Sequence, residues 1–223
     1  MGYLGSKAAS GAFQAIISQM PPHDTYIELF LGSGAVMRAK PAALHSYGVD
    51  LNYECITGFQ HRENLELIHL DAFCFLEGFD FSSAGKVLIY ADPPYLLSTR
   101  TSAKRYKHEF TEQDHAKLIS ILHQVPASVI LSGYPSKKYD ELLFDWRSIT
   151  FQAMTRGGPR TEQLWMNFDT SGAHWATFAG KNFTDRQRIK RKAGRWAKDY
   201  ELLPTQERLA ILAGILNTHS RTS

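Results

Sequence analysis

The chain has 223 residues and a formal net charge of +3, with 43% hydrophobic and 21% charged residues. This composition argues against disordered, collagen-like and low-complexity classes. The longest notable apolar run, residues 209–216, has eight residues, far fewer than the roughly 18 that a membrane-spanning helix needs. No signal peptide core is visible at the start. The two cysteines form no metal or disulfide pattern. We therefore expect a cytoplasmic protein with no metal and no membrane partner.

The positive charge is concentrated near the end of the sequence. Residues 184–223 contain nine basic and four acidic residues, net +5, whereas residues 1–183 contain sixteen and eighteen, net −2. Such clustering marks either a solvated helix face or a surface for a polyanion. We expect a main domain at residues 1–183 and a basic helical extension at residues 184–223.

Strands and helices alternate along the main domain. Apolar runs typical of strands cover residues 26–30, 45–49, 65–70, 86–91 and 128–131, and helix-like segments cover residues 8–20, 34–40, 52–62, 72–78 and 111–124. This alternation predicts an α/β, Rossmann-like fold with a mostly parallel sheet. Residues 146–154 and 163–168 follow with only a loop between them, which predicts an antiparallel hairpin at the sheet edge.

Three of the predicted strands end directly in an aspartate: Asp50, Asp71 and Asp92. Ligands of open α/β sheets bind beyond the carboxyl ends of the strands. One such aspartate is readily explained as a helix cap, but three in succession indicate a ligand site. The first strand also leads into Phe-Leu-Gly-Ser-Gly at residues 30–34, a tight turn that lacks the third glycine of the dinucleotide fingerprint.

The sequence Asp92-Pro93-Pro94-Tyr95 directly follows the buried run at residues 86–91. The prolines hold the backbone rigid and leave carbonyl oxygens without competing N–H donors. A carboxylate, a fixed carbonyl and an aromatic ring then converge at the sheet edge. This set suits an amino group on a planar base, whose two hydrogens the oxygens accept while the ring stacks.

Phe30 to Gly34 followed by Asp92 to Tyr95 resembles the S-adenosylmethionine-dependent amino-methyltransferases, and more narrowly the compact bacterial and phage forms of Dam-type DNA adenine-N6 methylases. Lys7, in Tyr-Leu-Gly-Ser-Lys at residues 3–7, is similar to their N-terminal motif. The resemblance covers about residues 3–168 and implies a methyltransferase version of the fold. It also implies roles for individual residues.

The resemblance implies a catalytic set and a set that binds the cofactor S-adenosylmethionine. The catalytic set is Asp92, Pro93, Pro94 and Tyr95. The cofactor set is Lys7, Glu28, Phe30, Gly32, Gly34, Asp50, Asp71, Ala72 and Asp92. Within it, Lys7, the turn and Asp50 would line the methionine and ribose, and Asp71 with the backbone at Ala72 would hold the adenine.

One departure concerns sequence recognition. Large Dam-type enzymes carry a recognition insert between the third cofactor-site strand and Asp-Pro-Pro-Tyr, but here Asp71 and Asp92 stand only 21 positions apart. Nucleic-acid contacts must therefore come from elsewhere or be weak. The candidates are basic residues after two strands and in the extension: Arg100, Lys104, Arg105, Lys107, Arg156, Arg160, Arg188, Arg191, Lys192 and Arg195.

The extension predicts two helices. Ile189, Ala193, Trp196, Tyr200 and Leu203 recur at helical spacing and form an apolar stripe, with basic residues at most other positions. Pro204 ends this helix, and Thr205 can cap a second. We expect a helical hairpin with a packed apolar seam and a basic exterior that grips phosphates without reading bases.

Together these features predict methyl transfer from S-adenosylmethionine to the N6 amino group of adenine in DNA, by a monomer or weak dimer. RNA adenine, or cytosine N4 in DNA, remains an alternative target, and a catalytically silent nucleic-acid-binding protein is a more distant one. Roles in restriction-modification, phage self-protection and orphan regulation all stay open.

Overall fold

The structure is a computed structural model that describes residue 7 and residues 12–60, 62–99, 109–155, 158–169 and 183–219. Its contacts divide the chain into two units, Met1–Phe178 and Ala179–Ser223, which we describe separately. Within the described ranges, no helix has both the length and the apolar character to cross a membrane.

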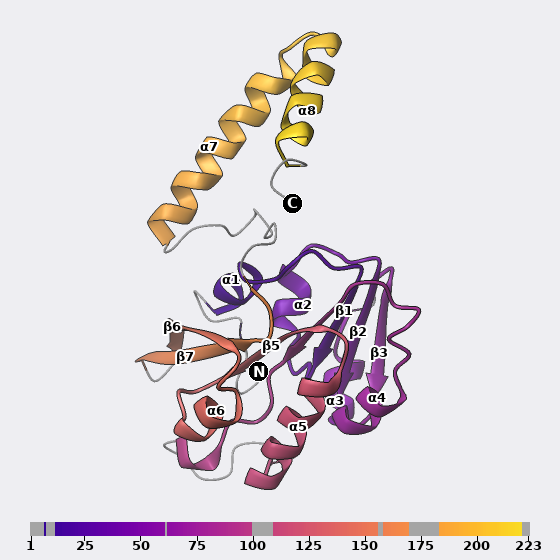
Figure 1. Cartoon of the computed structure of the whole chain (residues 1–223), viewed down its shortest axis with the longest axis vertical. Helices are drawn as coiled ribbons and strands as arrows, with labels where there is room; N and C mark the ends of the chain where they lie inside the picture. The colour runs from indigo at the N-terminus through magenta and orange to yellow at the C-terminus, as the bar shows by residue number, and fades with distance from the viewer. Residues whose placement is uncertain are drawn as a thin grey trace. The chain divides into compact units, whose positions relative to one another are not determined.

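A seven-stranded sheet forms the centre of the first unit (Figure 1). Its strands are β1 (Thr25–Leu29), β2 (His45–Asp50), β3 (Leu65–His69), β4 (Val87–Ala91), β5 (Ser128–Gly133), β6 (Arg147–Thr155) and β7 (Gly158–Met166). Their spatial order is β3-β2-β1-β4-β5-β7-β6. The first five strands are parallel, and β7 runs antiparallel to both β5 and β6. This topology confirms the predicted Rossmann-like fold with a mostly parallel sheet and an antiparallel edge hairpin.

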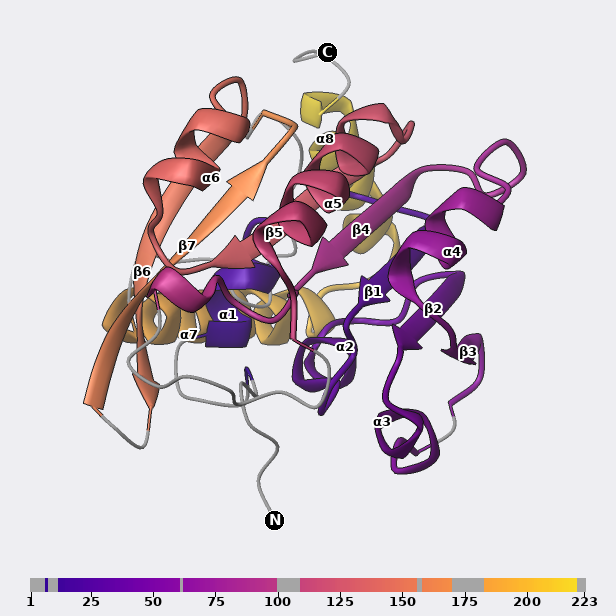
Figure 2. The same cartoon turned by 90° about the horizontal axis from the view of Figure 1, so that it is seen from below.

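Helices cover both faces of the sheet (Figure 2). They are α1 (Ala12–Ile17), α2 (Ala35–Ala39), α3 (Tyr53–Thr57), α4 (Ala72–Gly78), α5 (Glu112–Gln124) and α6 (Lys137–Leu142), with a 3-10 turn at Leu97–Thr99. Helices α4 and α5 pack on one hydrophobic cluster at one face of the sheet, and helices α1 and α2 pack on a second cluster at the other face. Both faces of the central strands are therefore buried, as their continuous apolar sequences require.

Alternation along the strands decides which side chains reach which face. Ile27 and Ile89 belong to the cluster under α4 and α5, whereas Tyr26 and Tyr90 belong to the cluster under α1 and α2. Residues two positions further along the chain point to the same side as these tyrosines. Ile130 on β5 and Leu164 on β7 also belong to the α1/α2 cluster. By the same alternation, the residue two positions after Ile130 and the residue two positions before Leu164 face the α1/α2 side of the sheet.

Several element boundaries differ from the predicted ones. Of the helix expected at residues 8–20, the described part is helical over Ala12–Ile17, and the helix expected at residues 52–62 stops at Thr57. After the cap at Gly58, the Phe59 ring lies buried in the core, in the space that a Cβ on Gly34 would need. Helix α6 was not predicted, because its sequence carries few apolar residues.

The edge hairpin is longer and tighter than predicted. Thr155 pairs with Gly158, and Ala153 pairs with Arg160. Strand pairing therefore extends through much of the loop expected between residues 154 and 163, and Arg160 lies within β7.

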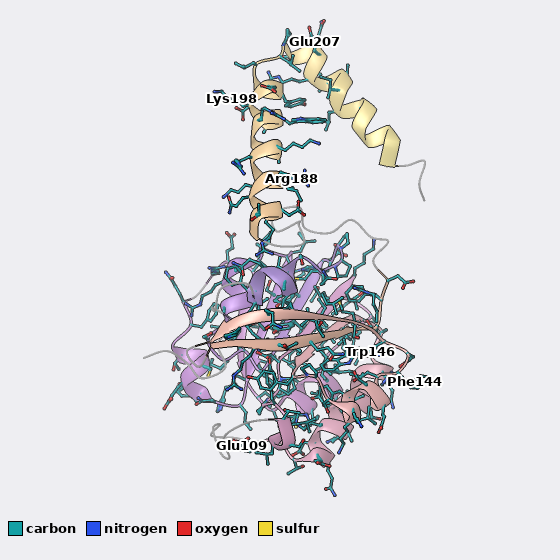
Figure 3. The ribbon with its side chains drawn as sticks, turned by 90° about the vertical axis from the view of Figure 1, so that its left-hand side faces the viewer. Glu109, Phe144, Trp146, Arg188, Lys198 and Glu207 are labelled. Carbon is teal, nitrogen blue, oxygen red and sulfur yellow. The ribbon has the colours of Figure 1, made fainter. Side chains whose placement is uncertain are left out.

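The second unit consists of α7 (Phe183–Glu201) and α8 (Thr205–His219), which diverge from the turn that joins them (Figure 3). At this turn the Tyr200 hydroxyl donates a hydrogen bond to the Arg208 carbonyl at 2.9 Å. Further along, Trp196 is 63% exposed and Leu209 is 62% exposed. The two predicted helices are present, but the prediction of a continuous packed seam through Trp196 is wrong, because the helices separate beyond their joint.

Candidate functional site

The strand register brings the predicted site residues to one edge of the sheet. Leu29 at the end of β1 pairs with both Val49 and Ala91, and Ala91 pairs with Leu131. The segments that follow β1, β2, β4 and β5 therefore leave the sheet side by side. The chain order turns back between β1 and β4, and such a switch point is where open α/β sheets bind ligands.

The glycine-containing turn after β1 is fastened to the end of β2. The Gly32 backbone N–H donates to Asp50 Oδ2 at 2.7 Å, and the Asn52 N–H donates to Oδ1 at 2.7 Å. Gly32 and Gly34 have φ of 52° and 60°, and Phe30 has φ of 61°. Only glycine adopts this left-handed region without strain, so Phe30 is held there by its surroundings. Asp50 thus fixes the shape of the turn.

Asp71 caps α4 with one oxygen. Its Oδ1 accepts from the Phe73 and Cys74 backbone N–H groups at 2.9 and 3.3 Å. The described residues provide no hydrogen bond to Oδ2, which leaves this oxygen able to accept from a ligand. Beside it, Phe73 stacks on Phe110 with centroids 5.7 Å apart, and Phe30 meets Phe110 edge-on at 5.2 Å. Sequence reasoning did not single out this aromatic wall, because two of its members lie outside the strand-end motifs.

Lys7 joins the residues of the Asp-Pro-Pro-Tyr segment. Its Nζ lies 2.7 Å from both oxygens of Asp92 and donates to the Tyr95 hydroxyl at 2.6 Å. The Lys7 side chain is only 6% exposed. Burial lowers the pKa of Lys7, but Asp92, Tyr90 and Glu162 together more than offset this and keep the pKa above its ordinary value. The structure thus puts Lys7 at the Asp92 end of the site as a buried cation.

Glu162 on β7 completes this buried cluster. Its Oε2 lies 3.7 Å from Lys7 Nζ and accepts a hydrogen bond from the Tyr95 hydroxyl at 3.4 Å. Burial raises the pKa of Glu162. The sequence carried one usable signal, since Glu162 alternates with the apolar Leu164 and therefore faces the same side as Tyr90. Without the order of strands, however, nothing connects β7 to Asp92.

The ring of Tyr95 is buried and meets that of Tyr134 edge-on, with centroids 4.5 Å apart. The Arg160 guanidinium lies 5.8 Å from the centre of the Tyr134 ring. Arg160, a predicted nucleic-acid contact, thus comes within one side chain of the site. Tyr134, which follows β5, was missed by sequence reasoning.

Glu28 is a buried carboxyl on β1. It accepts a hydrogen bond from the Tyr26 hydroxyl at 2.9 Å. Burial raises the pKa of Glu28 from 4.5 to about 8, and the nearby charge of Asp92 adds to this rise. Glu28 is therefore a neutral hydrogen-bonding group at neutral pH and stands beside the site without contacting Asp92 through a hydrogen bond.

Replacing Glu28 with glutamine should flatten the pH dependence of stability. Between about pH 4.5 and 8 the folded protein holds a proton on Glu28 that the unfolded chain has lost. The free energy of unfolding therefore falls as the pH rises through this window, by up to about 5 kcal/mol. Urea denaturation at several pH values should show this fall in the parent protein and lack it in Glu28→Gln. The exposed Glu63→Gln variant should retain it, and parallel curves for Glu28→Gln and the parent would contradict the argument.

Several predicted residues lie outside the described part of the chain: Arg100, Lys104, Arg105, Lys107 and Arg156. Among the described residues, no group of three or more histidine, cysteine or acidic side chains could hold a metal ion. The nucleic-acid contacts that were predicted in the basic extension all lie in α7. There Arg188 is paired with Asp185 at 2.8 Å, while Arg191, Lys192 and Arg195 are exposed.

Comparisons with known proteins find similar structures but no similar sequences. No known family model and no curated protein matches its sequence. Among solved structures, the 23S rRNA methyltransferase ErmE is 10% identical, with 76% of this chain and 72% of that chain covered and a TM-score of 0.46. The N-methyltransferase NodS of Bradyrhizobium japonicum is 10% identical over 69% and 90% of the chains, with a TM-score of 0.46. A precorrin decarboxylase of Methanobacterium thermoautotrophicum is 13% identical over 74% and 95%, with a TM-score of 0.42.

Proposed function

We propose that this protein transfers a methyl group from S-adenosylmethionine to the N6 amino group of adenine in DNA. One observation carries the proposal. The Asp92 carboxylate lies at the switch point of the sheet, and both of its oxygens accept hydrogen bonds at 2.7 Å from one nitrogen, Nζ of Lys7. A carboxylate in this position can hold an amino group in the same way. The rigid Pro93-Pro94 segment and the Tyr95 ring adjoin it.

The chain offers suitable partners for the cofactor. Asp50 uses one hydrogen bond on each oxygen, and each oxygen can accept another from a ribose hydroxyl. Oδ2 of Asp71 can accept from the adenine amino group, beside the aromatic wall of Phe30, Phe73 and Phe110. When bound, S-adenosylmethionine supplies an electrophilic methyl group. The described residues therefore fit the cofactor, although they belong to a fold shared with enzymes of other chemistry.

The chain's own residues would prepare the amino nitrogen for attack. This nitrogen is a poor nucleophile because its lone pair is delocalised into the ring. Asp92 would accept one amino hydrogen and the Pro93 carbonyl the other, which favours the form with a localised lone pair. Tyr95 would stack on the base and hold the nitrogen in line with the methyl group. In a duplex the base must first be flipped out of the helix.

Lys7 occupies the place where the amino group would bind, so it must move away from Asp92 when the base arrives. Glu162 and the Tyr95 hydroxyl are already within reach of Lys7 Nζ. They can keep this cation partnered, so that its displacement does not leave a buried unpaired charge, which would be costly.

Nucleoside analysis would test the proposal directly. The purified protein should be incubated with isotope-labelled S-adenosylmethionine and with DNA or RNA of mixed sequence, then digested and examined by mass spectrometry. We expect labelled N6-methyladenine from DNA. Label in RNA or at cytosine N4 would assign an alternative target. Cofactor binding with no transfer to any nucleic acid would contradict an enzymatic role.

Only α4 and a short segment separate β3 from β4, so this part of the first unit leaves little room for a recognition insert. We infer that α7 contributes phosphate contacts. Replacing Arg191 and Arg195 with glutamine should weaken DNA binding and reduce the slope of log affinity against log salt by about 2. The matched control replaces Lys86 and Lys117 of the first unit and should leave the slope unchanged. Equal slopes in fluorescence anisotropy titrations of both variants would contradict this role.

A further inference from the structure

A chain of two hydroxyl groups lies behind Asp92. Ser132 near the end of β5 donates through Oγ to Asp92 Oδ1 at 2.8 Å. The Tyr90 hydroxyl on β4 lies 3.1 Å from the same Oγ. Ser132 and Tyr90 are 0% and 1% exposed. Both follow from the alternation of side chains, which turns them and Asp92 to the α1/α2 side of the sheet.

The direction of this chain can be deduced. The Ser132 hydroxyl has one proton and two acceptors within reach, Asp92 Oδ1 at 2.8 Å and the Ala91 carbonyl at 3.4 Å. The shorter bond to the charged oxygen is the stronger. The Tyr90 hydroxyl must then be the donor to Ser132 Oγ. Burial raises the pKa of Tyr90, so this phenol keeps its proton over the working pH range.

The carboxylate of an aspartate needs such support. Rotation about its Cβ–Cγ bond is soft, because torsions between sp³ and sp² atoms have broad minima. While Lys7 bridges both oxygens of Asp92, the carboxylate plane is fixed by this cation. Once the cation leaves, Ser132 is the hydrogen-bond donor that the described residues still provide to Oδ1.

We propose that Ser132, supported by Tyr90, is a positioning residue that holds the Asp92 carboxylate in the plane required by the amino group of the target base. This inference rests on the proposed function. Oδ1 accepts from Ser132 and from Lys7 at the same time, so the bond from Ser132 fixes the carboxylate plane and still leaves both oxygens able to accept an amino hydrogen. The hydrogen bond from Ser132 contributes to the alignment of the amino group for attack, and not to the binding of DNA or of the cofactor.

The test compares Ser132→Ala and Tyr90→Phe with the parent enzyme in methylation kinetics. A lost hydrogen bond to a charged group corresponds to a fall in kcat of about 10-fold or more for Ser132→Ala. Tyr90→Phe, which keeps the ring and removes only the hydroxyl, should lower kcat by a smaller factor. KM for DNA and for S-adenosylmethionine should stay within about 2-fold in both variants, since the change acts on alignment. Ser46→Ala, a buried serine on β2, is the matched control and should keep the parent kcat.

The outcomes separate this inference from the proposed function. If the parent protein methylates no nucleic acid, the proposed function fails. If the parent is active and Ser132→Ala or Tyr90→Phe keeps full kcat, the positioning role is overturned while the function stands. An increase in KM with unchanged kcat would also overturn it. If Ser132→Ala does not fold, Tyr90→Phe decides the question alone, because its packing is preserved.

Discussion

Replacing Asp92 with asparagine should lower the rate of methyl transfer by at least about 10²-fold, while S-adenosylmethionine binds almost as tightly as before. Asparagine keeps the size of the side chain but can turn an N–H group toward the amino nitrogen, so the lone pair is no longer localised. Initial rates with labelled cofactor measure the first effect, and calorimetric titration measures the second. Asparagine is preferable to alanine, which would leave Lys7 facing an empty space.

The matched control is Asp80→Asn. Asp80 lies in an exposed turn after α4, where it accepts hydrogen bonds from Ser82 and Ser83. This variant loses the same charge at a distance from the site and should keep the parent rate. If Asp92→Asn retained half of the parent activity or more, the catalytic assignment of Asp92 would be wrong.

Replacing Lys7 with methionine should have the largest effect on stability, a loss of about 3–5 kcal/mol in the free energy of unfolding at neutral pH. The change removes the cation that Asp92 and Glu162 share. The charge of Asp92 already raises the pKa of Glu162, so the two carboxyls repel each other once Lys7 is gone. Urea denaturation should show that this loss becomes smaller as the pH is lowered, because burial already raises the pKa of Glu162 and its protonation ends the repulsion.

A double variant isolates the charge effect. Combining Lys7→Met with Glu162→Gln removes one of the two opposed carboxylates and should restore part of the lost stability. Lys40→Met provides a control for burial, because Lys40 is also buried but forms no ion pair in the described chain. Strictly additive losses for Lys7→Met and Glu162→Gln would show that the three groups are not coupled.

The fold could be predicted from local sequence because each strand carries its own signal. Apolar runs bounded by turn residues located all seven strands, and the segment predicted as a helix at residues 111–124 begins at a capping box of Thr111 and Asp114. Helix α6 was not predicted, because its six residues include few apolar ones and show no helical periodicity. The boundary that moved at α3 lies beside a contact between distant segments, that of Phe59 with Gly34.

The site was only half predictable. Asp50, Asp71 and Asp92 could be predicted because each follows a predicted strand, and a parallel sheet brings strand ends together. Ser132 and Glu162 could not be predicted, because their contacts depend on which strands are neighbours in the sheet. The partner of Lys7 was equally hidden, since a lone lysine far from any strand end can reach many acids. In the extension, helical spacing predicted the helices but not the angle between them.

The ion pair of Lys7 has a consequence for the order of folding. Lys7 and Asp92 are separated by 85 positions in the chain, and Glu162 comes later still. Contacts between such distant segments form slowly, because a large loop must close before they are gained. During synthesis, β1 to β5 can assemble before β7 exists, but Lys7 then lacks one of its two acidic neighbours. A chain stalled before β7 would therefore lack Glu162, and Lys7 would have Asp92 but not its second acidic neighbour.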